Sequence, residues 1–449
     1  MRNKNDFLTH VPPMGIYETL YKFLNSFGTY MGEKDTHPWS QGYPLTSQIP
    51  GGPEMPKSIS IVSTDLKYPK AWGHPELRQT IAEYYNHYYN SSLDYENIMI
   101  FAGGRPGLTA LLMFLKSDIK VHIASTEYTP YYDMLRFFKR DYKLIESTEE
   151  NIFSPTTDEY FGANTNERKL LLLSNPCNPT GITRKEDELK DLIEKAEASG
   201  HGILFDEAYE FFHTPPISSL KFVNNINNSN IFVAGAATKG LQAPGIRIGW
   251  VVAAKKYIDI LGNFSSFGMG GVSLPSQLYA LKLFDEKRIN LARDTISRFY
   301  DMQREKYQNG FLELGLELFS GNGGFYHWCK LPGNLTSEKL NEELFKRGAA
   351  ILKGTDCDMH RLGNASHLRH FFRFSFGPLF PNSYDSDLKI LGELTELDII
   401  KLKKILNISR ADILLMEERF RGDFLLNNKI STDEENNEWI DLLEDKCSD

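Results

Sequence analysis

The chain has 449 residues, 41% of them hydrophobic and 24% charged, which is typical of a globular protein with one large and one smaller domain. A net charge of −9 argues against a general nucleic-acid-binding surface. No apolar run is long enough to span a bilayer and the first residues lack a signal-peptide pattern, so we expect a cytoplasmic protein without a membrane partner.

The four cysteines, Cys177, Cys329, Cys357 and Cys447, are widely scattered. They form no CxxC pair and have no metal-ligand spacing, which predicts reduced thiols and no metal site. Cys177 is either a small residue in a turn or a nucleophile, and its position in the sequence leaves both readings open.

The first part of the chain alternates between strand and helix patterns. A helix over residues 16–27 and a Gly/Pro-rich loop over 37–56 precede a helix that opens at Pro75. Strands are predicted over residues 97–102, 120–125, 169–174, 201–205, 230–235 and 247–254, and helices over 108–115, 131–138 and 186–199. This alternation predicts an α/β fold with a mostly parallel sheet and helices on both of its faces.

After about Leu274 the pattern becomes helical and then mixed. Helices over residues 276–284, 289–308, 338–348 and 396–407, with strands near 323–332 and 370–377, predict a smaller α+β domain. We expect four regions: an N-terminal segment over 1–55 that joins the small domain and the cleft, a large domain over 56–290, a small domain over 291–420, and an acidic tail over 421–449. The tail is either solvated or a short docking helix around Trp439.

Two turns after predicted strands carry candidate ligand-binding groups. In AGGRPGL, Gly103 and Gly104 open a helix and offer backbone N–H groups to an anion, although such glycines also occur for steric reasons. In SNPCNPTG, a Pro/Gly turn holds the amide of Asn178, which is able to donate to a ligand oxygen, although two Asn-Pro steps are also compatible with a plain turn.

Two further segments carry ionisable candidates. Asp206 in FDEAY follows a buried strand directly, where a carboxylate needs a cationic partner. In TKGLQAPGIRIGW, Lys239 is suited to form an imine, and Thr238 and Arg247 are suited to hold a phosphate, unless the two basic residues are solvated surface charges. Because ligands of such sheets lie at the carboxyl ends of the strands, we expect these segments to meet in one site.

Taken in chain order, seven segments resemble the class I and II aminotransferases: YPKAWGHPELR, AGGRPGL, EYTPYYDM, SNPCNPTG, FDEAY, TKGLQAPGIRIGW and FFRFSFG. The resemblance covers residues 68–377. It implies the fold-type-I architecture with a sheet of the seven-stranded type and pyridoxal 5′-phosphate (PLP) as the cofactor. It also implies a homodimer with shared active sites that acts on an amino acid and a 2-keto acid.

The resemblance implies roles for residues around the cofactor ring. Lys239 matches the Schiff-base lysine, which also moves the substrate proton, and Asp206 matches the carboxylate that pairs with the pyridine nitrogen. Asn178 and Tyr209 match the groups that hydrogen-bond the phenolic oxygen of the cofactor, with Asn178 also near the substrate. Tyr128 matches the aromatic residue that stacks on the ring.

The resemblance also implies an anion cradle and a substrate anchor. The phosphate cradle is assigned to four residues: Gly104, Arg105, Thr238 and Arg247. Tyr68 matches a tyrosine that reaches the phosphate in the neighbouring subunit. Arg373 matches the arginine that grips the substrate α-carboxylate, with a solvent-facing strand residue as the alternative.

Three departures from the family pattern leave alternatives open. Ala237 and Thr238 replace a serine-rich approach to Lys239, Arg105 replaces a smaller residue, and the insertion segment (residues 354–372) is longer and more polar than expected, which leaves the side-chain pocket undefined. Other PLP reactions (β- or γ-elimination, deamination, cyclisation or decarboxylation) and a non-catalytic PLP-binding protein are the alternative functions. The sequence does not reveal the amino donor, the keto acid or the pathway.

Overall fold

The computed structural model describes residues 11, 13, 15–162 and 167–394. The described residues up to Ile390 form one compact unit, and the described residues from Leu391 onward belong to a second. The helix predicted over 396–407 and the acidic tail lie outside the described residues. The domain boundaries expected near residues 55 and 290 stay predictions. Among the described helices, none is both long and apolar enough to cross a membrane.

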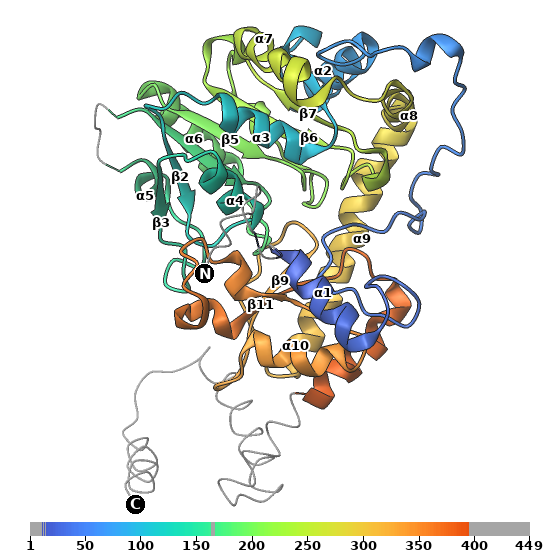
Figure 1. Ribbon diagram of the computed structural model, residues 1–449, viewed down its shortest axis with the longest axis vertical. Coiled ribbons are helices and arrows are strands. Elements are labelled where there is room, and N and C mark those ends of the chain that lie inside the picture. Colours follow the sequence, from blue (N-terminus) through green and yellow to red (C-terminus); the bar gives the residue numbers. More distant parts are fainter. Residues whose placement is uncertain (1–10, 12, 14, 163–166, 395–449) are drawn as a thin grey trace, which may run out of the picture. The chain divides into compact units, whose positions relative to one another are not determined.

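The large sheet has seven strands in the order β1-β7-β6-β5-β4-β2-β3 (Figure 1). They are β1 (Ile98–Phe101), β2 (Lys120–Ala124), β3 (Tyr142–Ile145), β4 (Lys169–Ser174), β5 (Gly202–Asp206), β6 (Ile231–Ala236) and β7 (Gly249–Val252). Neighbours from β6 to β3 are parallel, and β7 runs antiparallel to both β1 and β6. The prediction of a mostly parallel sheet is therefore confirmed.

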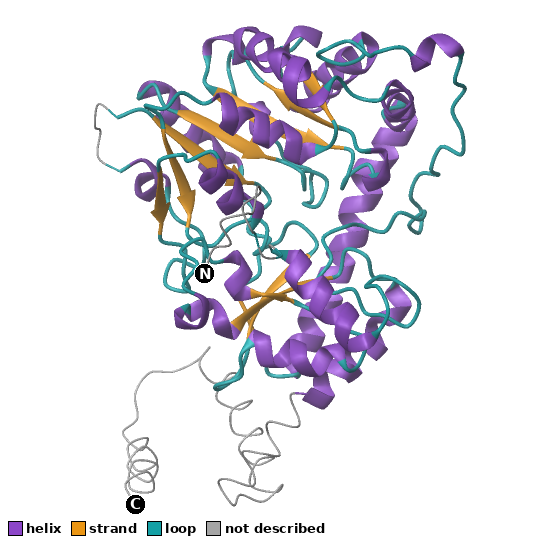
Figure 2. Ribbon diagram, in the orientation of Figure 1, coloured by secondary structure: helices purple, strands orange, loops and turns teal. Residues whose placement is uncertain are grey.

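Helices cover both faces of this sheet (Figure 2). They are α2 (Pro75–Tyr89), α3 (Gly104–Phe114), α4 (Pro130–Phe137), α5 (Thr157–Phe161), α6 (Glu186–Ala198), α7 (Lys255–Phe264) and α8 (Leu274–Leu283). Leu170, Leu172 and Leu204 share one core cluster with residues of α3, α4 and α7. Because side chains alternate along a strand, the buried Leu171 and Ile203 face the other side, where α6 contacts β5.

Among the large-sheet strands and the helices that cover them, three elements were not predicted: β3, α5 and α7. In β3 the side chain of Lys143 is exposed and those of Tyr142 and Leu144 are only partly buried, as expected of a short strand at the edge of a sheet. Helix α5 has five residues, too few for a periodic pattern to show.

The small sheet is antiparallel, in the order β10-β11-β9-β8. Its strands are β8 (Glu317–Leu318), β9 (Tyr326–Lys330), β10 (Leu352–Lys353) and β11 (Phe371–Ser375), with helices α1 (Ile16–Phe27) and α10 (Ser337–Phe345) beside it. The ring of Phe23 on α1 packs edge-on against Phe345 on α10, which places α1 beside the helix of the small sheet. Helix α9 (Glu286–Glu313), with 28 residues, runs from the large sheet to the small one (Figure 1).

Candidate active site

Three candidate segments meet because neighbouring strands end at the same level. In the register of the large sheet, Ser174 pairs with Asp206, and Asp206 pairs with Ala234. The turn carrying Asn178 follows β4, Asp206 ends β5, and Lys239 follows β6. The carboxyl ends of parallel strands therefore bring these side chains together, as expected for this class of sheet.

A cavity of about 500 Å³ lies at this edge of the sheet. Ten of the residues proposed from the sequence line it: Gly104, Arg105, Tyr128, Asn178, Asp206, Tyr209, Thr238, Lys239, Arg247 and Arg373. The Gly/Pro-rich loop over 37–56 contributes Ser40 to Tyr43 to its wall. Tyr68 is not among the lining residues, and 94% of its surface is exposed.

The amine of Lys239 is partly buried and donates a hydrogen bond to the carbonyl of Gly42. Its Nζ lies 5.5 Å from the ring centre of Tyr209 and 5.6 Å from that of Phe325. Burial, helped by the positive charges of Arg373 and Arg105, lowers the pKa of Lys239 to about 7. A neutral amine, which is the nucleophilic form of lysine, is therefore available near neutral pH.

The carboxylate of Asp206 is held by neutral donors. Its Oδ2 accepts from the hydroxyl of Tyr131 at 2.9 Å, and its Oδ1 accepts from the backbone N–H of Ala208 at 3.2 Å. Burial raises the pKa of Asp206, and no side chain in the described part of the chain forms an ion pair with it. The cationic partner expected from the sequence is thus not a described side chain, and the cavity is the direction from which a ligand cation would reach this carboxylate.

The neighbouring Glu207 has a different environment from Asp206. It is 2% exposed and accepts hydrogen bonds from the hydroxyl of Ser218 and the backbone N–H of Ser219, the latter at 2.7 Å. Burial raises the pKa of Glu207 to about 8. These contacts give Glu207 a structural role in the segment after β5.

Arg373 on β11 is 4% exposed and reaches the cavity from the small sheet. Its Nη1 donates to Asn178 Oδ1 at 2.8 Å and its Nη2 to the carbonyl of Ser40 at 2.7 Å, while its Nε is buried without a protein partner. A Cβ at Gly42 would lie 2.8 Å from the hydroxyl of Tyr326, so the absence of a side chain at this glycine allows Tyr326 to approach the loop. Buried guanidinium donors with a free N–H suit a carboxylate ligand.

The opposite end of the cavity suits an anion. Gly104 begins α3, whose first N–H groups have no partner within the helix. A Cβ at Gly103 would lie 2.3 Å from Arg247 Nη2, and a Cβ at Gly249 would lie 2.5 Å from the carbonyl carbon of Gly103. These glycines therefore allow Arg247 to approach the start of α3. Arg105 is next to them, and its Nε donates to the hydroxyl of Tyr128 at 3.0 Å.

Two residues that contact the predicted site residues were not identified from the sequence. Tyr131, in the first turn of α4, donates to Asp206 across 75 positions of the chain, a contact for which the sequence carries no local signal. Tyr326 on β9 shares a hydrogen bond with the hydroxyl of Tyr209, and Arg373 lies 4.2 Å over its ring. Because Tyr326 comes from the small sheet, no local pattern could have placed it here.

The insertion segment does not line the cavity in the part of the chain that the structure describes. It begins with a 3-10 turn at Gly354–Cys357 and then packs on the loop that carries Tyr128. Met359 N–H donates to the carbonyl of Ser125 at 2.9 Å, and Thr129 Oγ1 donates to the carbonyl of Asp356 at 2.9 Å. The insertion segment therefore supports the cavity wall on the side of Tyr128. On this side it does not itself form a pocket for the substrate side chain.

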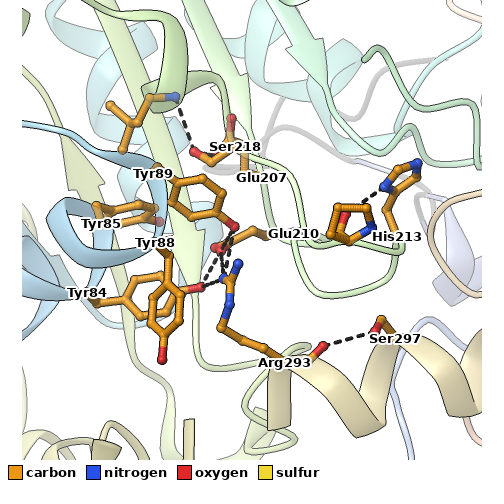
Figure 3. A network of polar contacts seen from close by, with 12 residues as sticks. Tyr84, Tyr85, Tyr88, Tyr89, Glu207, Glu210, His213, Ser218, Arg293 and Ser297 are labelled. Atoms are coloured by element: carbon orange, nitrogen blue, oxygen red, sulfur yellow. Dashed lines mark hydrogen bonds and ion pairs between the residues drawn. The ribbon is translucent and has the colours of Figure 1, made fainter. Parts of the chain in front are cut away.

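A buried network begins at the residue after Tyr209 (Figure 3). Glu210 accepts hydrogen bonds from the hydroxyls of Tyr84 and Tyr89 on α2, and Arg293 Nη1 on α9 lies 3.0 Å from Glu210 Oε1. The guanidinium of Arg293 also lies 4.1 Å over the ring of Tyr88. The segment that carries Asp206 and Tyr209 is thereby joined to two helices.

Comparison with known proteins gives one consistent result. Residues 38–380 match the family model described as aminotransferase class I and II. The aspartate aminotransferase of Pyrococcus horikoshii is 26% identical over 289 residues, covering 62% of this chain and 72% of that protein. The aspartate/prephenate aminotransferase of Thermus thermophilus is 25% identical over 338 residues, covering 70% and 84%.

Solved structures show the same fold. A double mutant of the Thermus thermophilus aspartate aminotransferase superposes with a TM-score of 0.71 at 20% identity, covering 86% of this chain and 97% of that one. An aminotransferase from Mycobacterium tuberculosis gives a TM-score of 0.70 at 21% identity, covering 87% and 100%. These likenesses support the fold described above, with its large, mostly parallel sheet and its smaller antiparallel sheet.

Proposed function

The chain belongs to the class I and II aminotransferases, and we propose that it moves an amino group between an amino acid and a 2-keto acid with PLP held at Lys239. One observation carries this proposal: Asp206 at the end of β5, Lys239 and Arg247 in the loop between β6 and β7, and Arg373 on β11 of the small sheet line a single cavity. A solvated lysine and arginine would not converge in this way.

The groups around the cavity fit PLP. The carboxylate of Asp206, without an ion-pair partner among the described residues, suits the protonated ring nitrogen, and the ring of Tyr128 suits the ring face. Arg247, with Thr238 and the start of α3, suits the phosphate. When bound, PLP withdraws electrons from the bonds at the substrate Cα and so makes the Cα proton removable.

The residues of the chain supply binding and proton transfer. Arg373 holds the substrate α-carboxylate, with its free Nε as an additional donor. Lys239, whose pKa of about 7 leaves a neutral amine, would take the proton from the substrate Cα and pass it to the cofactor within the same half-reaction, and would carry a proton in the opposite direction in the second half. Burial raises the pKa of Tyr209 well above its usual range, so its hydroxyl stays protonated and remains a hydrogen-bond donor.

We further propose a cytoplasmic homodimer in which Tyr68 serves the partner's site, with small-molecule substrates and no nucleic-acid or membrane partner. The exposure of Tyr68 outside the cavity of its own subunit supports this assignment. Exposed apolar side chains on the same stretch, Ile61, Val62 and Leu66, support a second copy as the covering surface.

The absorbance spectrum of the purified protein with PLP tests the proposed reaction. Adding single amino acids without a keto acid should convert the bound cofactor to pyridoxamine phosphate for one group of donors and release the matching keto acid. Lys239→Ala should abolish turnover and keep PLP binding through Arg247, whereas Lys116→Ala, at an exposed lysine, should behave as wild type. Ammonia release would favour deamination or elimination, and failure to bind PLP would contradict the proposal.

A further inference from the structure

Glu127 is a buried carboxyl group that the proposed mechanism does not use. It is 1% exposed and lies in the loop between β2 and α4, immediately before Tyr128. Its Oε2 accepts from the backbone N–H of Tyr128 at 2.8 Å and from the hydroxyl of Ser174 at 2.9 Å. Its Oε1 also accepts from the backbone N–H of Ser174, at 3.3 Å. One carboxyl group therefore joins the ends of β2 and β4.

The hydrogen bonds continue from Ser174 to the substrate side of the cavity. The oxygen of Ser174, a lining residue, accepts from the backbone N–H of Asn178 at 3.2 Å. Asn178 Oδ1 in turn accepts from Arg373 Nη1 at 2.8 Å. The donors and acceptors are consistent in direction from Arg373 through Asn178 and Ser174, because the Ser174 hydroxyl donates to Glu127 and accepts from Asn178.

The same loop is also held from the small domain. The backbone N–H of Glu127 donates to the carbonyl of Cys357 in the insertion segment at 3.2 Å, and Met359 N–H donates to Ser125. The loop thus has fixed contacts before, at and after Glu127. Its position decides where the ring of Tyr128 lies in the cavity.

Stability alone does not account for a carboxyl group in this place. Burial raises the pKa of Glu127 to about 7, and within the described residues no cation forms an ion pair with it. An apolar side chain of similar volume would avoid this desolvation penalty. Such an apolar side chain would lack the acceptor oxygens that hold Tyr128 and Ser174 in place.

We propose that Glu127 is a positioning residue that aligns the Tyr128 loop with the Ser174–Asn178 turn, and thereby aligns the ring-stacking and carboxylate-binding sides of the cavity. The inference rests on the proposed function, since it assigns a cofactor ring to Tyr128 and a substrate carboxylate to Arg373. Glu127 acts through these neighbours and touches neither ligand itself.

The test compares Glu127→Leu, Glu127→Gln and Ser174→Ala with wild type, and uses Glu150→Leu, at an exposed glutamate without a side-chain partner, as the control. Measured are the PLP content, the circular dichroism of bound PLP, and kcat and KM separately. Glu127→Leu should retain PLP but change its dichroism and lower kcat by about 10- to 100-fold, the range that follows from a misplacement on the scale of 1 Å. Glu127→Gln, which keeps an acceptor oxygen, should recover most of both signals.

The double variant Glu127→Leu/Ser174→Ala decides whether the two residues act as one unit. If they do, its loss should be clearly smaller than the sum of the two single losses, because both substitutions break the same Glu127–Ser174 link. Independent, additive losses, or a lower melting temperature with unchanged dichroism and kcat, would overturn the proposal. If Glu127→Leu does not fold, Glu127→Gln and Ser174→Ala carry the test by the same dichroism. Wild-type protein that fails to bind PLP would instead contradict the proposed function.

Discussion

At the scale of single residues, the burial of Lys239 makes its amine more reactive and also lowers the stability of the cofactor-free protein. Its pKa, lowered from 10.5 to about 7, is mainly a consequence of burial, with Arg373 and Arg105 adding positive charge nearby. The same environment makes the charged form costly in the folded protein. A reactive amine and a less stable cofactor-free protein therefore have the same cause.

This cause gives a pH-dependent prediction for the cofactor-free protein. Between pH 7 and 10.5 the unfolded chain binds a proton at Lys239 that the folded chain does not, so this residue makes the wild type more stable as the pH rises. Relative to Lys239→Met, the wild type should gain about 2 kcal/mol in free energy of unfolding between pH 7.5 and 9.5. Urea unfolding at both pH values measures it.

Lys116→Met, at an exposed lysine, is the matched control, and its difference from wild type should stay the same at both pH values. A constant difference between wild type and Lys239→Met across the range would contradict the lowered pKa of Lys239.

At the scale of elements, helix α9 connects the two sheets through two arginines. Arg293, near its start, reaches Glu210 and the tyrosines of α2 (Figure 3). Arg304, further along, donates to the carbonyl of Gly324 at 2.6 Å, just before β9. The segment after β5 and the turn before β9 are thus held by one helix, and each contact lies within two residues of a tyrosine that lines the cavity, Tyr209 in the first and Tyr326 in the second.

Removing one partner of the buried Arg293–Glu210 pair should lower the free energy of unfolding. Arg293→Met leaves the Glu210 carboxylate buried without its cation, and we expect a loss of about 3–5 kcal/mol in free energy of unfolding. Adding Glu210→Gln to that variant should restore part of the loss, because the uncompensated charge is gone. Denaturant unfolding of the two single variants and the double variant measures the coupling.

The exposed pair Arg298–Asp294 on the same helix is the control for this cycle. Arg298→Ala should change the free energy of unfolding by no more than about 0.5 kcal/mol. An Arg293→Met variant as stable as Arg298→Ala would show that the network contributes little.

At the scale of the whole molecule, the position of Tyr68 leads to a test of shared active sites. Lys239→Ala and Tyr68→Ala homodimers should each have low activity, because each lacks one component in both sites. A mixed dimer has one site with both residues intact, so co-expression with random pairing should restore about one quarter of wild-type activity.

The co-expressed sample is compared with the two homodimers mixed only in the assay. Activity no higher than the sum of the two homodimers, with mixed dimers present by mass, would contradict sharing of the sites. The oligomeric state itself is measured by sedimentation or light scattering.

Much of the fold could be predicted from the chain alone, because strand and helix periodicities report burial on one or two faces of each element. They identified six of the large-sheet strands but missed β3, whose Lys143 breaks the apolar run. The candidate residues of the site were equally visible as polar residues directly after apolar strands, as with Asp206 after residues 202–205.

The sequence by itself thus determined the order of elements and which residue types stand at the strand ends, since both depend on neighbours along the chain. Only the tertiary structure decided which distant groups meet there: Tyr131 at Asp206, the carbonyl of Ser40 at Arg373, and the insertion segment against Glu127. These contacts depend on strand register and on how the small sheet packs on the large one, and residues separated by 75 to 333 positions leave no local pattern from which to read them.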